Sequence, residues 1–202
     1  MGSLDFHNRL LFLDGAMGTV LQQRGLPAGG QPELLNLTRP ELLEEIHREY
    51  IQAGSQIIYA NTFGANAHKL AATGHSVEEV VTRGVEIAKR AAEGTDTLVA
   101  VDMGPLGELL EPMGSLSFED AYALFREVAV AGARAGADLA VIETMTDLYE
   151  AKAALLAVKE NTDLPAFVTL SFETGGRTFT GCTIPSMART LEGLGADAIG
   201  LN

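Results

Sequence analysis

Six short apolar runs recur along this chain, and each of the first five is followed by a longer stretch with helical periodicity. The runs are rich in β-branched residues and bounded by Gly or Pro, which favours buried parallel strands. In chain order they are RLLFLDG (9–15), SQIIYANT (55–62), TLVAVDMG (97–104), ADLAVIET (137–144), PAFVTLSFE (165–173) and ADAIGLN (196–202). The sequence therefore predicts five β-α units followed by a sixth strand.

The stretches between the runs carry recognisable helix ends. Pro40 suits the first turn of a helix, and Ser76 with Glu79 three residues later forms the pattern of a capping box. Ser117 begins another helical stretch, which stops near Gly136. These signals complete the β-α alternation.

Repeated β-α crossovers leave two architectures, a closed (β/α)8 barrel or an open doubly wound sheet. The chain has no Gly-x-Gly-x-x-Gly turn after a strand, which weakens the case for a dinucleotide-binding open sheet. We therefore predict an α/β fold, a (β/α)8 TIM-type barrel that is incomplete, with about six of eight strands present. No linker divides the chain, so residues 1–202 are expected to form one domain.

Composition narrows the possible partners. The net charge of −13 argues against nucleic acid, because binding a phosphate backbone needs clustered Lys and Arg. No stretch approaches the length of a membrane span, and the start of the chain does not resemble a signal peptide. A single cysteine, Cys182, excludes an internal disulfide and fits a reducing, cytoplasmic setting.

Each apolar run finishes in polar or small residues, and in a β/α barrel all these tips meet at the C-terminal face, where active sites form. Polar residues at strand ends also begin loops or cap helices, and that explanation suffices for Thr144 and Ser171. It explains Asp14 and Glu143 less well, because each directly follows an apolar run, where an unpaired carboxylate is unfavourable. We expect these two carboxylates to share one cavity.

The motif DGAMGT (14–19) follows the first run. Gly15 and Gly18 allow close backbone approach, and a turn of small residues can point several N–H groups at an anion, although a plain structural turn is as common. Carboxylates that accept from an ammonium, beside N–H groups that donate to a carboxylate, describe a site for the α-amino and α-carboxylate groups of an amino acid.

The remaining reactive side chains give no convincing site. Cys182 precedes a helix and has no identifiable His partner, and the four histidines lack metal-ligand spacing. His47 is expected at the surface of a charged helix. The chain is thus predicted to have no metal site and no catalytic side chain of its own.

Several segments together resemble the homocysteine S-methyltransferase family, in the form found at the N-terminus of cobalamin-dependent methionine synthase. They are LFLDGAMGTVLQQRG, ANTFGAN, DMGPLGELLEPMGSLSFEDAY, VIETMTDLYEAKAAL and GADAIGLN, in the same order as in the family. The resemblance covers essentially the whole chain.

The resemblance implies a function. Members bind homocysteine and activate its thiol on a zinc held by three cysteine thiolates, and the thiolate takes a methyl group. In the resembled enzyme the donor is methylcobalamin on a separate domain, recharged from methyltetrahydrofolate on another, so cobalamin- and folate-binding domains are the implied partners. The first zinc cysteine follows a Gly-x-Asn at the sixth strand, and this sequence stops at Asn202, one residue before that position. The resemblance thus implies a domain truncated before its zinc ligands.

Carried over by motif, the resemblance also assigns substrate contacts. Asp14 and Glu143 would hold the amino group of homocysteine, and backbone at Gly15 and Ala16 would meet its carboxylate. The pocket would be completed by four residues at the tips of the second and sixth strands, Thr62, Phe63, Gly200 and Asn202.

Three other interpretations stay open. In the first, the chain belongs to a stand-alone homocysteine methyltransferase that uses betaine or S-methylmethionine. In the second, it is an inactive, non-catalytic fragment of that enzyme or of the cobalamin-dependent one. A further possibility is an unrelated open-sheet α/β protein, in which the strand order reverses within the sheet.

Overall fold

The computed structural model describes residues 10–27 and 29–202. Its centre is a sheet of five parallel strands in the order β1-β2-β3-β4-β5. Their bounds are β1 Ile57–Tyr59, β2 Leu98–Met103, β3 Leu139–Met145, β4 Ala166–Leu170 and β5 Ala198–Leu201. The order follows the sequence without a reversal, as in a β/α barrel, and this excludes the doubly wound alternative.

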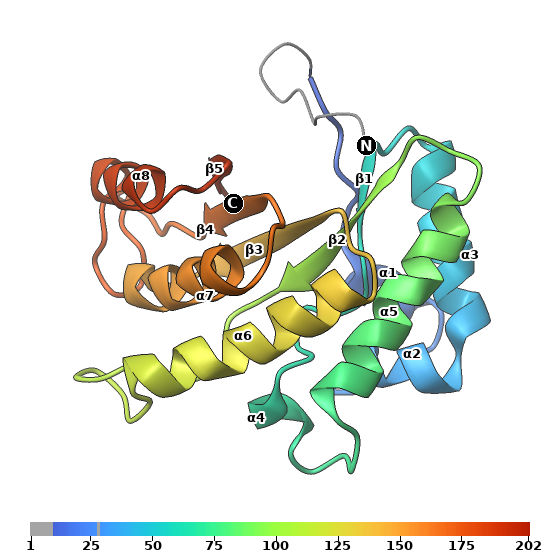
Figure 1. The fold of residues 1–202 in the computed structure, drawn as a ribbon, viewed down its shortest axis with the longest axis horizontal. Helices are drawn as coiled ribbons and strands as arrows, with labels where there is room; N and C mark the ends of the chain where they lie inside the picture. The colour runs from blue at the N-terminus through green and yellow to red at the C-terminus, as the bar shows by residue number, and fades with distance from the viewer. Residues whose placement is uncertain (1–9, 28) are drawn as a thin grey trace.

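The first predicted strand is replaced by a single bridge. Leu13 pairs in parallel with Ile57 of β1, flanked by hydrogen bonds from the Asp14 N–H to the Ile57 carbonyl and from the Gln56 N–H to the Phe12 carbonyl. The segment runs beside β1 in Figure 1. Leu10 and Phe12 are 75% and 60% exposed, so this run lacks the two-sided packing that holds the inner strands. The prediction of six full strands was wrong by this one, and Arg9, where the run begins, lies outside the described residues.

Helices follow the strands and cover one side of the sheet (Figure 1). The long ones are α3 Pro40–Gln52, α5 Val77–Ala92, α6 Phe118–Arg134, α7 Leu148–Asn161 and α8 Ile184–Gly193. Shorter ones are α1 Met17–Gln23, the 3-10 helix η1 Pro32–Leu34, α2 Leu35–Thr38 and α4 Ala67–Leu70. In the described part of the chain, no helix combines the length and apolar character needed to cross a membrane.

The predicted helix starts are confirmed. Pro40 occupies the first turn of α3, the Ser76 hydroxyl accepts from the Glu79 N–H at 3.1 Å, and the Ser117 hydroxyl accepts from the Asp120 N–H at 3.0 Å. Each cap satisfies a backbone donor that has no partner inside its helix. The sequence therefore fixes where these helices begin, and with them the loops that reach the strand tips.

Side chains of the strands alternate between two apolar clusters, as the period of two requires. In β2, Val99 and Val101 face the helices, and Gly132 of α6 is needed there because an added Cβ would lie 2.6 Å from Val101 Cγ2. Ala100 faces the other way, into a smaller cluster on the concave side with Val141 and Phe167. This alternation decides which polar residues reach the inner face.

His47 is buried, so the prediction of a surface position was wrong. It lies four residues after Leu43 and shares that buried face of α3, and neither ring nitrogen has a hydrogen-bond partner among the described residues. Burial lowers the pKa of His47 to about 4, which keeps the ring neutral near pH 7.

Candidate functional site

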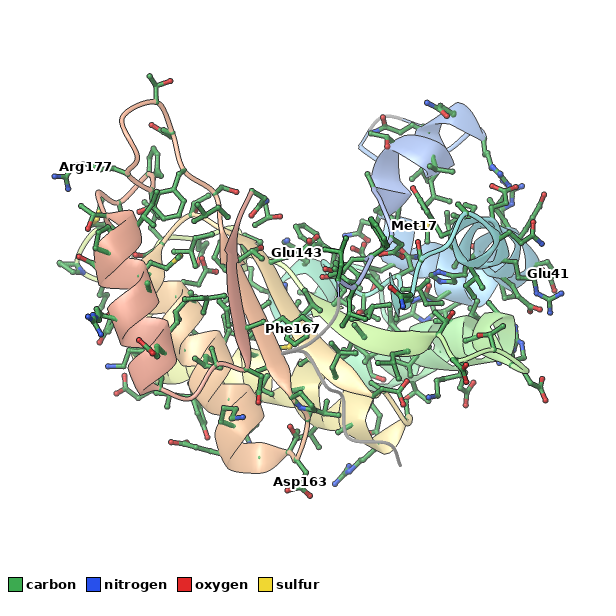
Figure 2. All side chains as sticks on the ribbon, turned by 90° about the horizontal axis from the view of Figure 1, so that it is seen from above. Met17, Glu41, Glu143, Asp163, Phe167 and Arg177 are labelled. Carbon is green, nitrogen blue, oxygen red and sulfur yellow. The ribbon has the colours of Figure 1, made fainter. Side chains whose placement is uncertain are left out.

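A cavity of about 450 Å³ opens at the carboxyl ends of the first strands. Met17 and Glu143, which line it from the first helix and from β3, are labelled in Figure 2. Its walls come from the turn before α1, from η1 and from the tips of β1, β2 and β3, and they comprise Asp14, Gly15, Ala16, Met17, Gly18, Pro32, Glu33, Tyr59, Ala60, Asn61, Phe63, Asp102, Glu143 and Thr144. The cavity lies where β/α barrels bind their ligands.

Strand alternation places the polar tips. Tyr59, Asp102 and Glu143 each stand two residues beyond an inner-face apolar residue of the same strand, so they point to the concave side. Strand β3 is irregular between Ile142 and Met145, and Thr144 there has φ 60°. Such irregularities redirect side chains beside functional sites. Here the irregularity falls on the two β3 residues that line the cavity.

Asp14 is held by the neighbouring strand. Its Oδ2 accepts from the Tyr59 N–H at 2.9 Å, whereas its Oδ1 is buried and has no partner within the described chain. Burial, with a smaller contribution from the charge of Glu143, raises the pKa of Asp14 to about 7. One oxygen is therefore fixed by the fold, and the other is buried at the cavity with its hydrogen-bonding capacity unsatisfied.

Asp102 and Glu143 share this environment. Asp102 is only 6% exposed, and its Oδ1 also lacks a partner among the described residues. Burial raises the pKa of both carboxyls, and the charges of Glu143, Asp14 and Glu33 raise that of Asp102 further. Neighbouring carboxyls that disfavour one another's ionisation are a frequent mark of a functional site.

Glu33 is the fourth carboxyl of the cavity. It lies in η1, is buried, and its Oε1 accepts from the Gly64 N–H at 2.7 Å. The lining contains no Lys, Arg or His among the residues that the structure describes. A cavity with four carboxyls and no cation suits a ligand that carries a positive charge, such as an ammonium group.

The turn before α1 forms another part of the cavity wall. Tyr50 donates from its hydroxyl to the Ala16 carbonyl at 3.1 Å, and an added Cβ on Gly15 would lie 3.0 Å from that hydroxyl oxygen. Gly15 therefore allows the aromatic side chain to hold the turn. Ala16 is the N-cap of α1 and offers no side-chain acceptor to the first N–H groups of the helix.

Five of the eight substrate-binding residues predicted from the sequence line the cavity, and three do not. Asp14, Gly15, Ala16, Phe63 and Glu143 line the cavity, as the sequence led us to expect of the two carboxylates. The other three lie outside its lining, and they are Thr62, Gly200 and Asn202.

Two of these three residues bond to residues that line the cavity. The Thr62 hydroxyl donates to the Asp102 carbonyl at 2.8 Å and accepts from the Asp102 N–H at 2.9 Å, which fixes the end of β2. Asn202 donates from Nδ2 to the Thr144 hydroxyl at 3.0 Å. Gly200 lies in β5 beside Thr169, where an added Cβ would lie 3.1 Å from Thr169 Cγ2.

Sequence reasoning did not include Asp102, Glu33 or Tyr59 in the site. The signal for Asp102 was present, because it too directly follows an apolar run. Glu33 had no such signal, since it stands in a loop segment whose fold over the cavity depends on tertiary packing.

The residues present do not fit a catalytic zinc site. Within the described ranges, no group of three or more His, Cys, Asp or Glu side chains could hold a metal ion. Cys182 lines a different cavity of about 790 Å³, bounded also by Met113 and Tyr149. Its Sγ donates to the Thr183 carbonyl at 3.3 Å, and burial raises the pKa of the thiol.

Comparison with known proteins agrees with this geometry. Residues 11–202 match the family model described as homocysteine S-methyltransferase. The chain is 36% identical to methionine synthase of Mycobacterium leprae and 34% identical to that of Mycobacterium tuberculosis, in each case over 96% of this chain and 18% of the relative. It thus spans about a fifth of the length of these relatives.

A solved structure has the same fold. The metallated form of the homocysteine methyltransferase MmuM from Escherichia coli superposes with a TM-score of 0.86 at 26% identity, covering 96% of this chain and 75% of that one. Taken with the family match over nearly the whole described sequence, these findings establish that the chain belongs to the homocysteine S-methyltransferase family.

Proposed function

We propose that this chain is the homocysteine-binding domain of a zinc-dependent methyltransferase that makes methionine by methyl transfer from methylcobalamin. The observation that carries the proposal is the cavity with four carboxyls and no lining cation at the strand tips of a homocysteine S-methyltransferase fold. The two relatives named methionine synthase favour a methyltetrahydrofolate-dependent parent over a stand-alone enzyme that uses betaine or S-methylmethionine.

Within this proposal, Asp14 and Glu143 accept hydrogen bonds from the ammonium group of homocysteine. Asp14 presents Oδ1, which is buried and unpartnered in the described chain, so an incoming N–H donor satisfies it. The backbone at Gly15 and Ala16 receives the carboxylate, beside the first N–H groups of α1, which have no side-chain cap.

Phe63 lies along the remaining part of the amino acid. Gly104 makes this position possible, since an added Cβ there would lie 2.4 Å from a Phe63 ring carbon. In this proposal Thr62 and Asn202 have a supporting role, through Asp102 and Thr144 respectively, and Gly200 is the small residue that packs beside Thr169.

The only basis for zinc and cobalamin in this proposal is the resemblance of the chain to the family. The described residues do not provide the ligands of a catalytic zinc, so we derive no step of methyl transfer from them. The step assigned to this chain is the recognition and orientation of the amino acid. Its partners in the parent are cobalamin- and folate-binding domains.

Calorimetric titration with L-homocysteine tests this step. The matched ligand is 4-mercaptobutanoic acid, which keeps the thiol and carboxylate but lacks the amino group. We expect it to bind at least about 30-fold more weakly, because it leaves buried carboxyls unpaired. Glu143→Gln should weaken the binding of homocysteine and leave the affinity for the mercapto acid unchanged. Equal affinity for the two ligands contradicts the proposal.

A further inference from the structure

The cavity holds more negative charge than one ammonium group can balance. Asp14, Glu33, Asp102 and Glu143 line a single space of about 450 Å³, and a bound amino acid brings one positive charge to them. Closely spaced carboxyls in a buried site cannot all ionise together, so at least one of them holds a proton while the cavity is empty.

Asp102 is best placed to hold that proton. At 6% exposure it is more buried than Asp14 or Glu143, and its Oδ1 has no partner among the described residues. Glu33 is engaged by the Gly64 N–H at 2.7 Å, and Asp14 by the Tyr59 N–H at 2.9 Å. The Tyr59 N–H partly offsets the effect of burial on the pKa of Asp14, and a backbone hydrogen bond from Met103 acts in the same direction on Asp102, which is the more buried of the two.

Among the residues that the structure describes, no cation lines the cavity beside Asp102. The groups that face it are Asp14 from the first run, Glu33 from η1, Tyr59 from β1 and Glu143 from β3. The opposite side of β2 packs through Val101 on Gly132 of α6.

Lys69, whose pKa is lowered by burial and partly restored by the charge of Glu33, is engaged outside the cavity. Lys69 donates from Nζ to the Pro105 carbonyl at 2.7 Å and lies 5.6 Å from the centroid of the Phe63 ring, and it is not part of the cavity lining. An ammonium that enters the cavity is therefore the cation that can change the state of Asp102.

We propose that Asp102 is a proton-exchanging, ligand-positioning carboxyl, which is neutral in the empty cavity and gives its proton to solvent when an ammonium group enters. This rests on the proposed function for its natural ligand, the amino acid. The ammonium brings one positive charge into the cavity that the Asp14, Asp102 and Glu143 carboxyls line, and this charge favours the ionised form of Asp102. The exchange balances, because the carboxylic acid becomes a carboxylate and the buffer takes the proton.

The rigid backbone of Asp102 suits this role. The Thr62 hydroxyl bonds both the N–H and the carbonyl of Asp102, so the end of β2 is fixed whether the carboxyl is charged or neutral. Burial, followed by the charges of Glu143, Asp14 and Glu33, raises the pKa of Asp102, which favours its neutral form.

Carbon-13 NMR of the 202-residue chain, labelled at the aspartate carboxyl carbons, tests the exchange directly. The exposed Asp163 is the internal reference. We expect the Asp102 signal to have the protonated shift at pH 7 without ligand, and to move to the carboxylate shift on saturation with L-homocysteine. Ethylammonium, which lacks the amino-acid skeleton, is the second probe and should produce the same movement at higher concentration.

Calorimetry in buffers of different ionisation enthalpy gives a second readout. The wild-type chain is expected to release protons on binding from Asp102 and in part from Asp14, because the pKa of Asp14 is about 7. Asp102→Asn is expected to release fewer protons per bound ligand than the wild-type chain, whereas Asp163→Asn releases as many. The NMR measurement on the wild-type chain decides the matter if Asp102→Asn does not fold.

The outcomes separate the two proposals. Movement of the Asp102 signal with ethylammonium but not with homocysteine contradicts homocysteine binding and supports the proton exchange. An Asp102 signal that is already charged at pH 7 without ligand, or that stays protonated with both probes present, overturns the exchange.

Discussion

The two ends of the sheet treat carboxylates in opposite ways. At the amino ends of β3 and β5, Asp138 and Asp197 each accept from a backbone N–H of the preceding strand in the sheet, Val99 for Asp138 and Ala166 for Asp197, both at 2.8 Å. Each also accepts from a lysine, Lys89 at 2.9 Å or Lys159 at 3.0 Å. At the carboxyl ends, Asp14 and Asp102 each keep one buried oxygen without a partner in the described chain.

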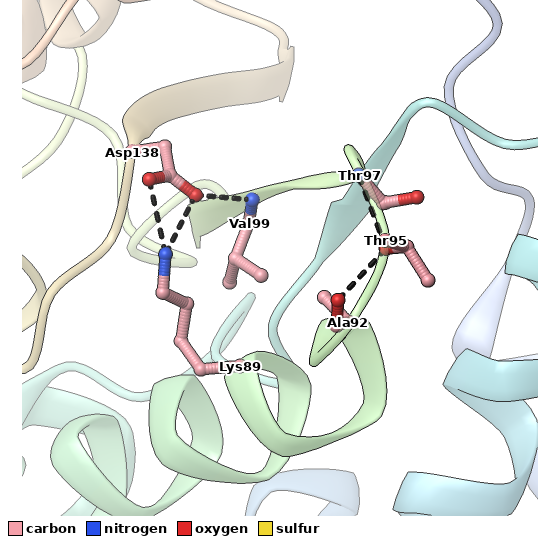
Figure 3. Close-up of polar contacts among 6 residues, drawn as sticks. All are labelled: Lys89, Ala92, Thr95, Thr97, Val99 and Asp138. Carbon is pink, nitrogen blue, oxygen red and sulfur yellow. Dashed lines mark hydrogen bonds and ion pairs between the residues drawn. The ribbon is translucent and has the colours of Figure 1, made fainter. Parts of the chain in front are cut away.

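The amino ends of β3 and β5, which we call the paired end because their carboxylates have partners, share one local motif. The carboxyl ends of the strands, where Asp14 and Asp102 lie, are called the unpaired end. Both aspartates of the paired end belong to a Gly-Ala-Asp triplet, whose glycine has φ 91° at Gly136 and 84° at Gly195 and turns the chain from a helix into the next strand. Figure 3 shows Asp138 between Lys89 and the Val99 N–H. The carboxylates at the amino ends of these strands are therefore paired, whereas those at the carboxyl ends, where β/α barrels bind ligands, keep oxygens that are unsatisfied within the described chain.

The largest expected effect is on ligand binding at the unpaired end. Asp14→Asn removes the charge while keeping the shape, and we expect L-homocysteine to bind about 100-fold more weakly, as for the loss of one partner in a buried charged pair. Asp138→Asn, at the paired end, should leave the affinity unchanged. Calorimetric titration of the two variants measures this, and equal losses would remove the distinction between the two ends.

The next effect concerns pH. The pKa of Asp14 is about 7 in the folded chain against 3.8 for an ordinary aspartate, so between these values the folded state binds more protons than the unfolded state. Its contribution to the free energy of unfolding is therefore largest below about pH 4 and falls as pH rises towards 7.

Urea denaturation at pH 5 and pH 8 checks this sign. We expect Asp14→Asn to be more stable than the wild-type chain at pH 8, with a smaller difference at pH 5, because the variant carries no charge to bury. A variant that is less stable than the wild-type chain at pH 8 would show that the Asp14 carboxylate is compensated in the folded state.

Part of the fold and of the candidate site can be predicted from short sequence signals, and part cannot. The β-α alternation, the caps at Ser76 and Ser117, and the carboxylates directly after apolar runs predict the order of the elements and the position of Asp14 and Glu143. Each of these signals depends on residues within a few positions of one another.

The remainder depends on packing between distant segments. Glu33 reaches the cavity because η1 folds over β1, and Asn61 ties the two by donating to the Pro32 carbonyl at 2.7 Å. Thr62 lies outside the cavity lining, and its hydroxyl is bonded to the backbone of Asp102, 40 residues later. A strand-tip position predicts proximity to the site, but which side chains line it is decided by these long-range hydrogen bonds.

At the paired end, truncation of the carboxylate should reduce stability. Asp138→Ala leaves the Val99 N–H and the Lys89 ammonium without their acceptor, and we expect the free energy of unfolding to fall by about 1–3 kcal/mol. Asp197→Ala is the matched change at β5 and should behave alike, whereas Ala at the exposed Asp163 should have little effect. Urea denaturation at pH 7 compares the three variants.

The smallest expected effect is the loss of the Lys89–Asp138 ion pair alone, with the backbone hydrogen bond to Asp138 retained. Lys89→Met keeps the acceptor for the Val99 N–H but removes the ion pair, whose partners have side chains that are 40% and 28% exposed. Solvent screens such a pair, so we expect a loss of at most about 1 kcal/mol, well below that of Asp138→Ala. Because salt screens the pair in the wild-type chain, the difference between the two should shrink further in 1 M NaCl. If Lys89→Met instead destabilises the chain as much as Asp138→Ala and is insensitive to salt, the lysine stem acts through packing, and the paired end owes its stability to more than the hydrogen bonds of its carboxylates.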